Sequence, residues 1–532
     1  MRSSARSLMD NRAVRLAAIL ILLCAALFRL YRLDFKSLDA DEIYTVAIAD
    51  PGNTVLDVLS IPLYNTPIAK PALYFLITHF FLRLKDHDFL LRFPSLAFGI
   101  LGVAATYAVG TKLFGRKEGL IAAFLLCFSL VHIRYSQMAR FYPLLLTLSL
   151  LSLYFLYRAM FAGGARSWVG FVVATALNLY THLFAFFVLL SLILFFVLTW
   201  LRGLVLRRRS QAVLDHQGHT LNSRSWVDTR RSSIFILVTS LVIIALAYLP
   251  MAPHLLDSLT GPKGIAEEPE TPGLELSVSF LRGLLAEWST GPGVGSLIFL
   301  MLFLAGFLAS LRNRRTPVLL VTSWMVVPFV ALFALPLQHR FYPRYLVFLL
   351  PVYLIVVARG LTACDSLVAW TWEKTRGEKY RSYRLALALG LVVLGAASLP
   401  ALQSYYAEIV SDWRSAAVLV GSSMSPGEIV VVSRPEHQVA LLRYDGRLEA
   451  AEFRIVRRRD PLPPDLPYQE GVWFVDKEGR GSEMSQLEDE LAGVAGGALI
   501  KTVFEGYGDH AAPGAGESMF FDVWVLHAVG AG

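Results

Sequence analysis

Residues 184–201 read FAFFVLLSLILFFVLTWL, an unbroken apolar stretch without a charged side chain. A helix needs about 20 such residues, and no fewer than about 17, to cross the hydrocarbon core of a bilayer. Similar runs recur through the 532-residue chain, which is 55% hydrophobic and 17% charged, with a mean hydropathy of +0.54. This composition excludes an ordinary water-soluble protein and predicts an α-helical polytopic membrane protein.

The apolar runs predict about eleven transmembrane helices. The expected spans are 15–31, 93–112, 118–134, 142–160, 167–183, 184–201, 233–250, 295–311, 317–336, 344–361 and 385–401. The run PALYFLITHFFLRL at 71–84 is left out because it is too short, begins with Pro71 and carries His79 and Arg83. We expect this segment to form a helix along the membrane interface.

Basic residues predict the orientation, because short cytoplasmic loops are enriched in Lys and Arg. With a cytoplasmic N-terminus and eleven spans, every strongly basic short loop lies inside, namely 112–117, 158–166, 207–231, 312–315 and 374–384. Counting 71–84 as a span would place the later basic loops outside. The formal net charge of +8 is explained by this topology, so the lipid bilayer is the expected partner and nucleic acid is not.

The last part of the chain has a different character. Polar residues become more frequent, and strand-like runs appear at 427–433 (GEIVVVS), 472–476 (VWFVD) and 519–528 (MFFDVWVLHA), with helix-like stretches at 405–423 and 482–494. We expect a transmembrane domain at 1–401, including an outer loop at 32–92 with interfacial helices. A small α/β extracytoplasmic domain is expected at 402–532.

The predicted topology collects polar residues on the outer face. The first outer loop contains SLDADEIYT (37–45), Lys70 and Arg92, and later loops contain RYSQMARFYP (134–143), YTH (180–182) and QHRFYPRYL (338–346). Charges at a bilayer edge are costly unless they are paired or used. The cations Lys70, Arg92, Arg140 and Arg344 also oppose the positive-inside bias. They therefore predict an anion site, and phosphate fits because arginine and lysine bind its oxygens well.

In this order, the motifs resemble those of the protein O-mannosyltransferase superfamily, including its bacterial relatives and the lipid A aminoarabinose transferase. The resemblance covers roughly residues 15–360 and implies the GT-C fold. It also implies a glycosyltransferase of a bacterial inner membrane that takes a sugar from a polyprenyl-phosphate carrier on the extracytoplasmic face. The family's DE pair corresponds to Asp41 and Glu42, and its phosphate-binding residues correspond to Lys70 and Arg92. This sequence departs from the family in having KPAL in place of HPPL or KPPL, and Met138 in place of the Glu of YSQEAR.

The predicted chemistry is proton removal from an acceptor hydroxyl or amine and stabilisation of a leaving phosphate. Asp41 is the expected base, with Glu42 shaping its environment, and Lys70 and Arg92, with Arg140 or Arg344, are expected to bind the phosphate. Further substrate-binding candidates are Tyr135, Gln137, Tyr142, His182 and Tyr345. A single displacement would invert the sugar. No ligand spacing requires a metal or a cofactor.

Each candidate also has an ordinary structural interpretation. Asp41 and Glu42 could cap a helix, Arg140 and Arg344 could be interfacial anchors, the tyrosines could belong to an aromatic belt, and His182 could sit at a helix end. A flippase is the alternative function, but it predicts charges deep within spans or paired broken helices. A membrane-anchored binding protein would need only one span. The sugar and the acceptor, whether protein, lipid or glycan, are not indicated by the sequence.

Overall fold

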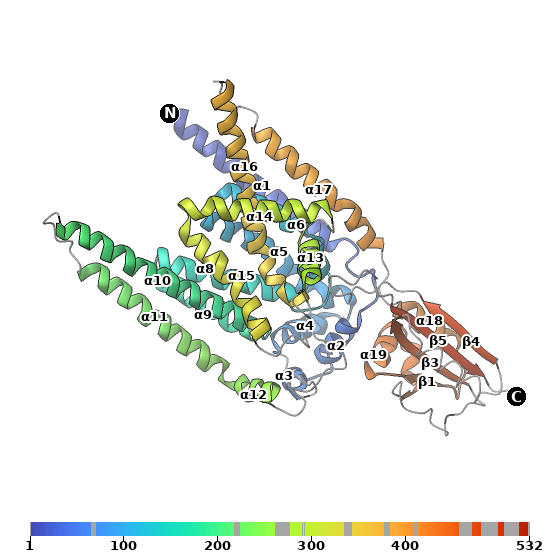
Figure 1. Ribbon diagram of the computed structural model, residues 1–532. Coiled ribbons are helices and arrows are strands. Elements are labelled where there is room, and N and C mark those ends of the chain that lie inside the picture. The colour runs from blue at the N-terminus through green and yellow to red at the C-terminus, as the bar shows by residue number, and fades with distance from the viewer. Residues whose placement is uncertain are drawn as a thin grey trace.

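The computed structural model combines a large helical part with a small α/β part near the C-terminus (Figure 1). It describes residues 2–64, 71–216, 224–260, 277–289, 291, 293–334, 343–376, 383–407, 412–456, 466, 471–479, 498–504 and 521–529. Lys70 and the predicted helix at 482–494 lie outside these residues.

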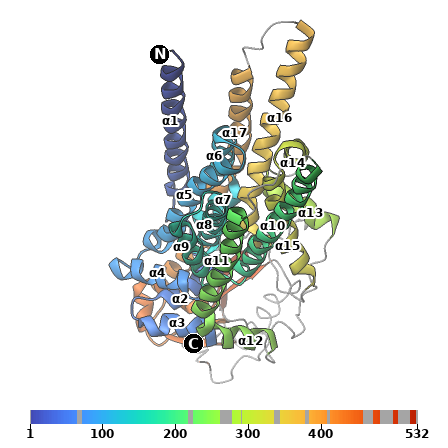
Figure 2. The same cartoon turned by 90° about the vertical axis from the view of Figure 1, so that its left-hand side faces the viewer.

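Within the described residues, eight helices are long and apolar enough to cross a membrane. They are α1 (Arg2–Leu30), α5 (Asp88–Leu113), α8 (Tyr142–Phe161), α10 (Ala185–His216), α11 (Arg224–Tyr248, continued by η1 at Leu249–Met251 and α12 at Ala252–Thr260), α14 (Val294–Asn313), α15 (Arg315–Ala334) and η3 with α16 (Pro343–Leu349 and Leu350–Arg376). The bent pair α6 (Arg116–Phe128) and α7 (Leu130–Ser136) makes a possible ninth. Figure 2 shows α1, α16 and α17 extending away from the side on which α2, α3 and α4 lie.

The predicted multi-span helical fold is confirmed, with a smaller number of clear spans than the expected eleven. Two predicted spans are not among the eight or nine. One is α9 (Ala165–Leu179), whose 15 residues are fewer than the roughly 17 that a span needs. The other is α17 (Tyr383–Ala407). The side of the membrane on which each terminus lies stays a prediction.

The excluded run at 71–84 forms a short helix. It is α4 (Leu73–Leu84), 12 residues long, and it packs against α2 (Ala40–Ala49) and α5. Its buried face includes Tyr74 and Phe75. The helix is therefore too short to span, as predicted, and it lies within the segment 32–92 that was predicted to form the first outer loop. The helix α3 (Val55–Tyr64) also contacts α4, whereas α13 (Val278–Glu287), later in the chain, contacts α14.

A buried arginine stabilises the break between α6 and α7, which bends the chain by 65°. Arg29, fully buried at the end of α1, donates hydrogen bonds to the Leu126 carbonyl at 3.4 Å and to Ser136 Oγ at 3.2 Å. Its Nη2 also lies 2.6 Å from His132 Nδ1. A broken helix exposes backbone groups that need partners inside a membrane protein. Arg29 supplies one such partner, to the Leu126 carbonyl, and fixes α7. The end of α7 forms the start of the RYSQMARFYP segment.

The α/β part contains a five-stranded sheet in the order β2-β1-β3-β5-β4. Its elements are α18 (Trp413–Ser423), β1 (Ile429–Val432), α19 (Pro435–Tyr444), η4 (Gly446–Ala450), β2 (Glu452–Ile455), β3 (Val472–Gly479), β4 (Ala498–Phe504) and β5 (Phe521–Val529). β1 is parallel to β2 and β3, whereas β5 is antiparallel to β3 and β4. The three predicted strands correspond to β1, β3 and β5, and the predicted helix at 405–423 is split between the end of α17 and α18.

Candidate active site

The DE pair lies in the first turn of α2. The Asp39 N–H donates to Glu42 Oε2 at 3.1 Å, and the Asp39 carbonyl accepts from the Glu42 N–H at 2.9 Å. This reciprocal turn resembles a capping box and fixes where the helix begins. Successive residues of a helix point about 100° apart, so Asp41 and Glu42 face different surroundings. Negative side chains are also favoured at a helix N-terminus.

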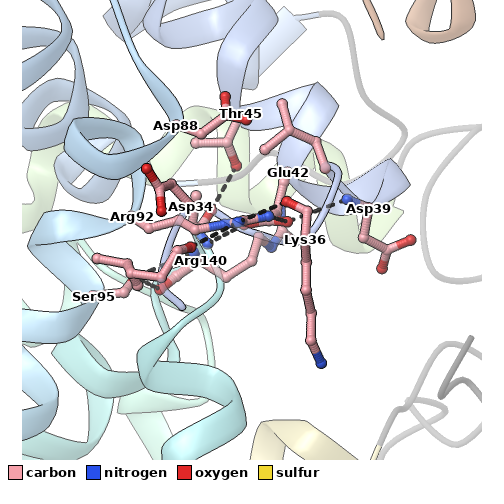
Figure 3. A network of polar contacts seen from close by, with 12 residues as sticks. Asp34, Lys36, Asp39, Glu42, Thr45, Asp88, Arg92, Ser95 and Arg140 are labelled. Carbon is pink, nitrogen blue, oxygen red and sulfur yellow. Dashed lines mark hydrogen bonds and ion pairs between the residues drawn. The ribbon is translucent and has the colours of Figure 1, made fainter. Parts of the chain in front are cut away.

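Glu42 forms a buried two-point ion pair with Arg92 (Figure 3). Arg92 Nε lies 2.8 Å from Glu42 Oε1, and Arg92 Nη2 lies 2.8 Å from Glu42 Oε2. The Ala139 N–H donates to the same Oε1 at 2.7 Å. Glu42 therefore links α2 to α5 and to the RYSQMARFYP segment. With its oxygens engaged and its side chain 4% exposed, it is placed to support the site rather than to take a proton.

Arg92 uses all of its donors within the protein. A guanidinium has five N–H groups. Besides the two bonds to Glu42, Arg92 donates to the carbonyls of Leu33 at 2.8 Å, Lys36 at 2.9 Å and Ser37 at 3.2 Å. Arg92 thus holds the outer loop against α5. In this arrangement Arg92 has no open donor for the phosphate that the sequence led us to expect it to bind.

Asp41 lies between two other guanidinium groups. Its Oδ2 is 3.2 Å from Arg344 Nη2, and its Oδ1 is 3.7 Å from Arg140 Nη2. Arg140 Nη1 also donates to the Asp41 carbonyl at 3.2 Å. Asp41 is 26% exposed, compared with 4% for Glu42. The structure therefore brings together three predicted site residues from α2, from the loop before α8 and from η3.

Arg140 is held less tightly than Arg92. It is 3% exposed, but its Nε makes no hydrogen bond within the described part of the chain. Burial is the largest influence on the pKa of Arg140 and lowers it, but Asp41, Tyr142 and Tyr345 together raise the pKa above the usual value. A buried, charged guanidinium with an unused donor is suited to binding an additional anion.

The polypeptide around Arg140 is fixed by neighbouring side chains. Thr45 Oγ1 donates to the Ala139 carbonyl at 3.0 Å, so α2 binds both backbone polar groups of Ala139. Ser95 Oγ donates to the Arg140 carbonyl at 2.8 Å and accepts from the Tyr74 hydroxyl at 2.6 Å. These contacts orient the start of α8 and the arginine that precedes it.

Four predicted aromatic candidates form one cluster beside Asp41 and its arginines. The ring centroids of Tyr135 and Tyr142 are 4.8 Å apart, those of His182 and Tyr345 are 4.8 Å apart, and those of Tyr142 and Tyr345 are 6.3 Å apart. Phe141 stacks on His182 at 4.7 Å. The cluster joins the YSQ, YTH and RYL motifs and makes an aromatic wall of the kind that sugars and lipid chains contact.

A cavity lies next to these residues, with an empty volume of about 700 Å³ counted to its open mouth. Its lining combines predicted site residues with residues that were not predicted: Arg32, Leu33, Lys36, Ser37, Asp39, Glu42, Arg92, Arg134, Tyr135, Gln137, Met138, Arg344 and Tyr405. Figure 3 shows the carboxylate of Asp39 and the amine of Lys36 pointing away from the Arg92–Glu42 pair.

Lys36 and Arg134 are the main additions to the predicted site. Lys36 Nζ lies 3.5 Å from the centroid of the Tyr405 ring, and the Arg134 guanidinium lies 5.5 Å from it. The signal that could have identified them is the one that indicated Arg140, namely a cation on the outer face against the positive-inside bias. Met138, which replaces the family's glutamate, lines the same cavity as Asp39.

Two predicted substrate-binding residues have local structural partners. Gln137 Nε2 donates to the carbonyls of Arg29 at 3.0 Å and Tyr31 at 2.7 Å, and so caps the end of α1 while lining the cavity. His182 Nδ1 accepts from the Phe184 N–H at 3.1 Å. Within the described ranges, no group of three or more His, Cys, Asp or Glu side chains is placed to hold a metal ion.

Residues 69–213 match the sequence model of the family described as dolichyl-phosphate-mannose-protein mannosyltransferase. This segment is therefore similar to that family. It runs from shortly before α4 into α10 and includes Arg92, the RYSQMARFYP motif and His182. It covers a shorter region than the motif resemblance, which began before α2. No curated protein sequence matches the chain significantly.

Solved structures show that the whole chain has the GT-C fold. ArnT from Cupriavidus metallidurans in the apo state is 14% identical, with a TM-score of 0.58, over 95% of this chain and 97% of that chain. The same protein bound to undecaprenyl phosphate gives 12% identity and a TM-score of 0.54 over the same shares. The oligosaccharyltransferase AglB from Archaeoglobus fulgidus, in complex with an inhibitory peptide and a dolichol-phosphate, is 11% identical, with a TM-score of 0.51, over 89% of this chain and 71% of that chain. The resemblance predicted from the motifs is thereby confirmed.

Proposed function

We propose that this protein is an integral-membrane glycosyltransferase that moves a sugar from a polyprenyl-phosphate carrier to an acceptor hydroxyl or amine. The observation that carries the proposal is the position of Asp41, which is partly exposed and lies between Arg140 and Arg344. The family match at 69–213 and the fold shared with structures bound to undecaprenyl phosphate and dolichol-phosphate support it.

In the proposed reaction, Asp41 accepts the proton of the acceptor group as its oxygen or nitrogen attacks the anomeric carbon. The bond between that carbon and the phosphate oxygen breaks, and the polyprenyl phosphate leaves with one more negative charge. General-base assistance of this kind is typically worth about 10²- to 10⁴-fold. A single displacement would invert the anomeric centre, and the scheme requires no metal; both features belong to the proposal.

Arg140 and Arg344 are the proposed phosphate ligands. Arginine forks match phosphate oxygens and strengthen as charge develops on the leaving group. A bound phosphate would compete with Asp41 for these two guanidinium groups, so donor binding would release Asp41 towards the acceptor. Lys36 and Arg134 add positive charge to the wall of the adjacent cavity. Lys70 remains a family-based candidate for the same role.

The remaining parts of the site fit supporting roles. The Arg92–Glu42 pair sets the position of α2, and the cluster of Tyr135, Tyr142, His182 and Tyr345 offers a surface for the sugar or the first prenyl units. We place the reaction on the extracytoplasmic face, because the charge pattern of the loops orients the chain that way. The sugar and the acceptor remain to be identified.

The proposal is tested with purified protein in lipid nanodiscs and a panel of short-chain polyprenyl-phosphate sugars. We expect protein-dependent release of polyprenyl phosphate from at least one donor when envelope lipids are supplied as acceptor. Mass spectrometry of lipids, proteins and glycans from cells with and without the protein should reveal the product. If no sugar-modified species depends on the protein and no donor is consumed, the glycosyltransferase proposal is wrong.

A further inference from the structure

The α/β part contacts the elements that build the candidate active site. Figure 1 shows α19 beside α2, and these two helices are in contact. Side chains of α2, including Ile43, Val46 and Ala49, lie in the same buried cluster as Trp413 of α18 and Leu441 of α19. The apolar face of the DE helix is therefore covered by the C-terminal part of the chain.

An arginine of α19 fixes the start of α5. Arg443 Nε lies 2.7 Å from Asp88 Oδ1, and Arg443 Nη1 lies 2.7 Å from Asp86 Oδ1. The Arg443 and Asp88 side chains are 8% and 9% exposed, so the pair is largely shielded from water. Asp88 opens α5, and Arg92 follows about one helical turn later. The ion pair therefore fixes the helix that presents Arg92 to Glu42.

The adjacent tyrosine joins α5 to the loop before the DE pair. The Tyr444 hydroxyl donates to Asp88 Oδ2 at 3.1 Å and accepts from the Leu38 N–H at 2.9 Å. Leu38 directly precedes Asp39, whose backbone begins α2. The Tyr444 hydroxyl thus connects α5 to the start of α2. The Arg92–Glu42 pair joins the same two elements. The Arg414 guanidinium covers the Tyr444 ring at 5.1 Å and donates to Asp88 Oδ2 at 3.4 Å.

We propose that the C-terminal α/β part is a positioning domain for the transferase site, and that Tyr444 and Arg443 act through Leu38, Asp86 and Asp88 to fix Asp41. The inference rests on the proposed function for its catalytic consequence. The structural part of the inference does not depend on that function. It is that the loop at 33–39 and the first turn of α2 depend on the side chains of Tyr444 and Arg443 for their position.

Two conservative changes test the inference in the full-length protein. Tyr444→Phe removes only the bridging hydroxyl, and Arg443→Gln removes the cation. Arg447→Gln is the matched control, because Arg447 is 56% exposed and pairs with Asp445 inside the α/β part alone. Arg443→Lys, which keeps a positive charge, tests for rescue.

Hydrogen–deuterium exchange at residues 37–45 gives a readout that needs no substrate. We expect faster exchange there in Tyr444→Phe and Arg443→Gln, partial recovery in Arg443→Lys and wild-type exchange in Arg447→Gln. With an active donor, kcat should fall about tenfold for each of the first two variants, the scale of one or two lost hydrogen bonds, while the KM for donor and the Kd for undecaprenyl phosphate stay close to wild type.

Unchanged exchange at 37–45 in both variants, or wild-type kcat per folded molecule accompanied only by a lower Tm, would overturn the positioning role. If the proposed function is wrong, the wild-type protein consumes no donor. The exchange measurement then decides by itself whether the α/β part orders the loop at 33–39.

Discussion

The carboxylate of Glu42 and the guanidinium of Arg92 meet through two N–O contacts of 2.8 Å, with side chains 4% and 3% exposed. This geometry distinguishes Arg92 from Arg140 and Arg344, which share its charge and its side of the protein. Breaking a buried pair by removing one partner typically costs about 3–5 kcal/mol, because the remaining charge is left buried without compensation.

Arg92→Gln and Glu42→Gln should therefore lower the Tm strongly. Any Arg92→Gln protein that folds should bind undecaprenyl phosphate with wild-type affinity, because no Arg92 donor is open to a ligand. The measurement is thermal unfolding beside a titration with undecaprenyl phosphate. Weakened binding in a stably folded Arg92→Gln protein would restore the family-based phosphate role to this residue.

Arg140→Gln and Arg344→Gln should give the opposite pattern. Each should weaken undecaprenyl phosphate binding by about 1.5–3 kcal/mol, the range for a hydrogen bond to a charged group, with a modest change in Tm. Lysine at either position should restore binding only in part, because it lacks the planar fork. Arg312→Gln, in the last turn of α14, is the control. Wild-type affinity in both arginine variants would remove them from the phosphate site.

Close packing of α14 and α16 depends on two glycines that face each other, Gly306 of α14 and Gly360 of α16. A Cβ atom at Gly360 would lie 1.8 Å from the Leu302 carbonyl oxygen, a backbone atom. The atoms nearest to a Cβ at Gly170 belong to the Phe155 ring, the closest at 2.6 Å, and that side chain can rotate. Gly360→Ala should therefore lower the Tm more than Gly170→Ala does, since overpacking typically costs about 1–3 kcal/mol. Equal losses of Tm in the two variants would mean that α14 and α16 separate easily.

Glu287 should make stability depend on pH. Burial raises the pKa of Glu287 to about 7, although Arg134 partly opposes this. The folded protein then keeps a proton that the unfolded chain loses near its ordinary pKa of 4.5, so stability falls as pH rises from about 4.5 to 7. Glu287→Gln should flatten the Tm curve over this interval relative to wild type. Parallel curves for the two proteins would contradict the raised pKa.

The membrane class and several residues of the candidate site could be predicted because both depend on energies that a sequence displays. Long apolar runs are costly in water, and charges are costly at a bilayer edge, so Asp41, Arg140 and Arg344 are conspicuous in the segments predicted to lie outside. The structure brings these three residues together. Their proximity could not be derived from composition or periodicity, because it depends on how α2, the loop before α8 and η3 pack.

Other features required tertiary information. Arg92 and Arg140 are the same residue type on the same face, and only the register of α2 against α5 decides which one meets Glu42. The apolar run at 118–134 predicts one straight span, yet the chain breaks at Ser129, where Arg29 from 97 residues away reaches the Leu126 carbonyl. The edge strand β2 reads EFRI, with two exposed and two half-buried side chains, so it lacks the buried pattern that identified β1.

The most direct test of the account is Asp41→Asn, which preserves size while removing the proton acceptor. The measurement is the rate of sugar transfer from a polyprenyl-phosphate donor, made beside the Tm and the Kd for undecaprenyl phosphate. We predict a loss of about 10²- to 10⁴-fold in rate, a Tm close to wild type, and phosphate affinity equal to or higher than wild type because the carboxylate no longer competes for Arg140 and Arg344. A well-folded Asp41→Asn protein that transfers sugar at the wild-type rate would contradict the central claim.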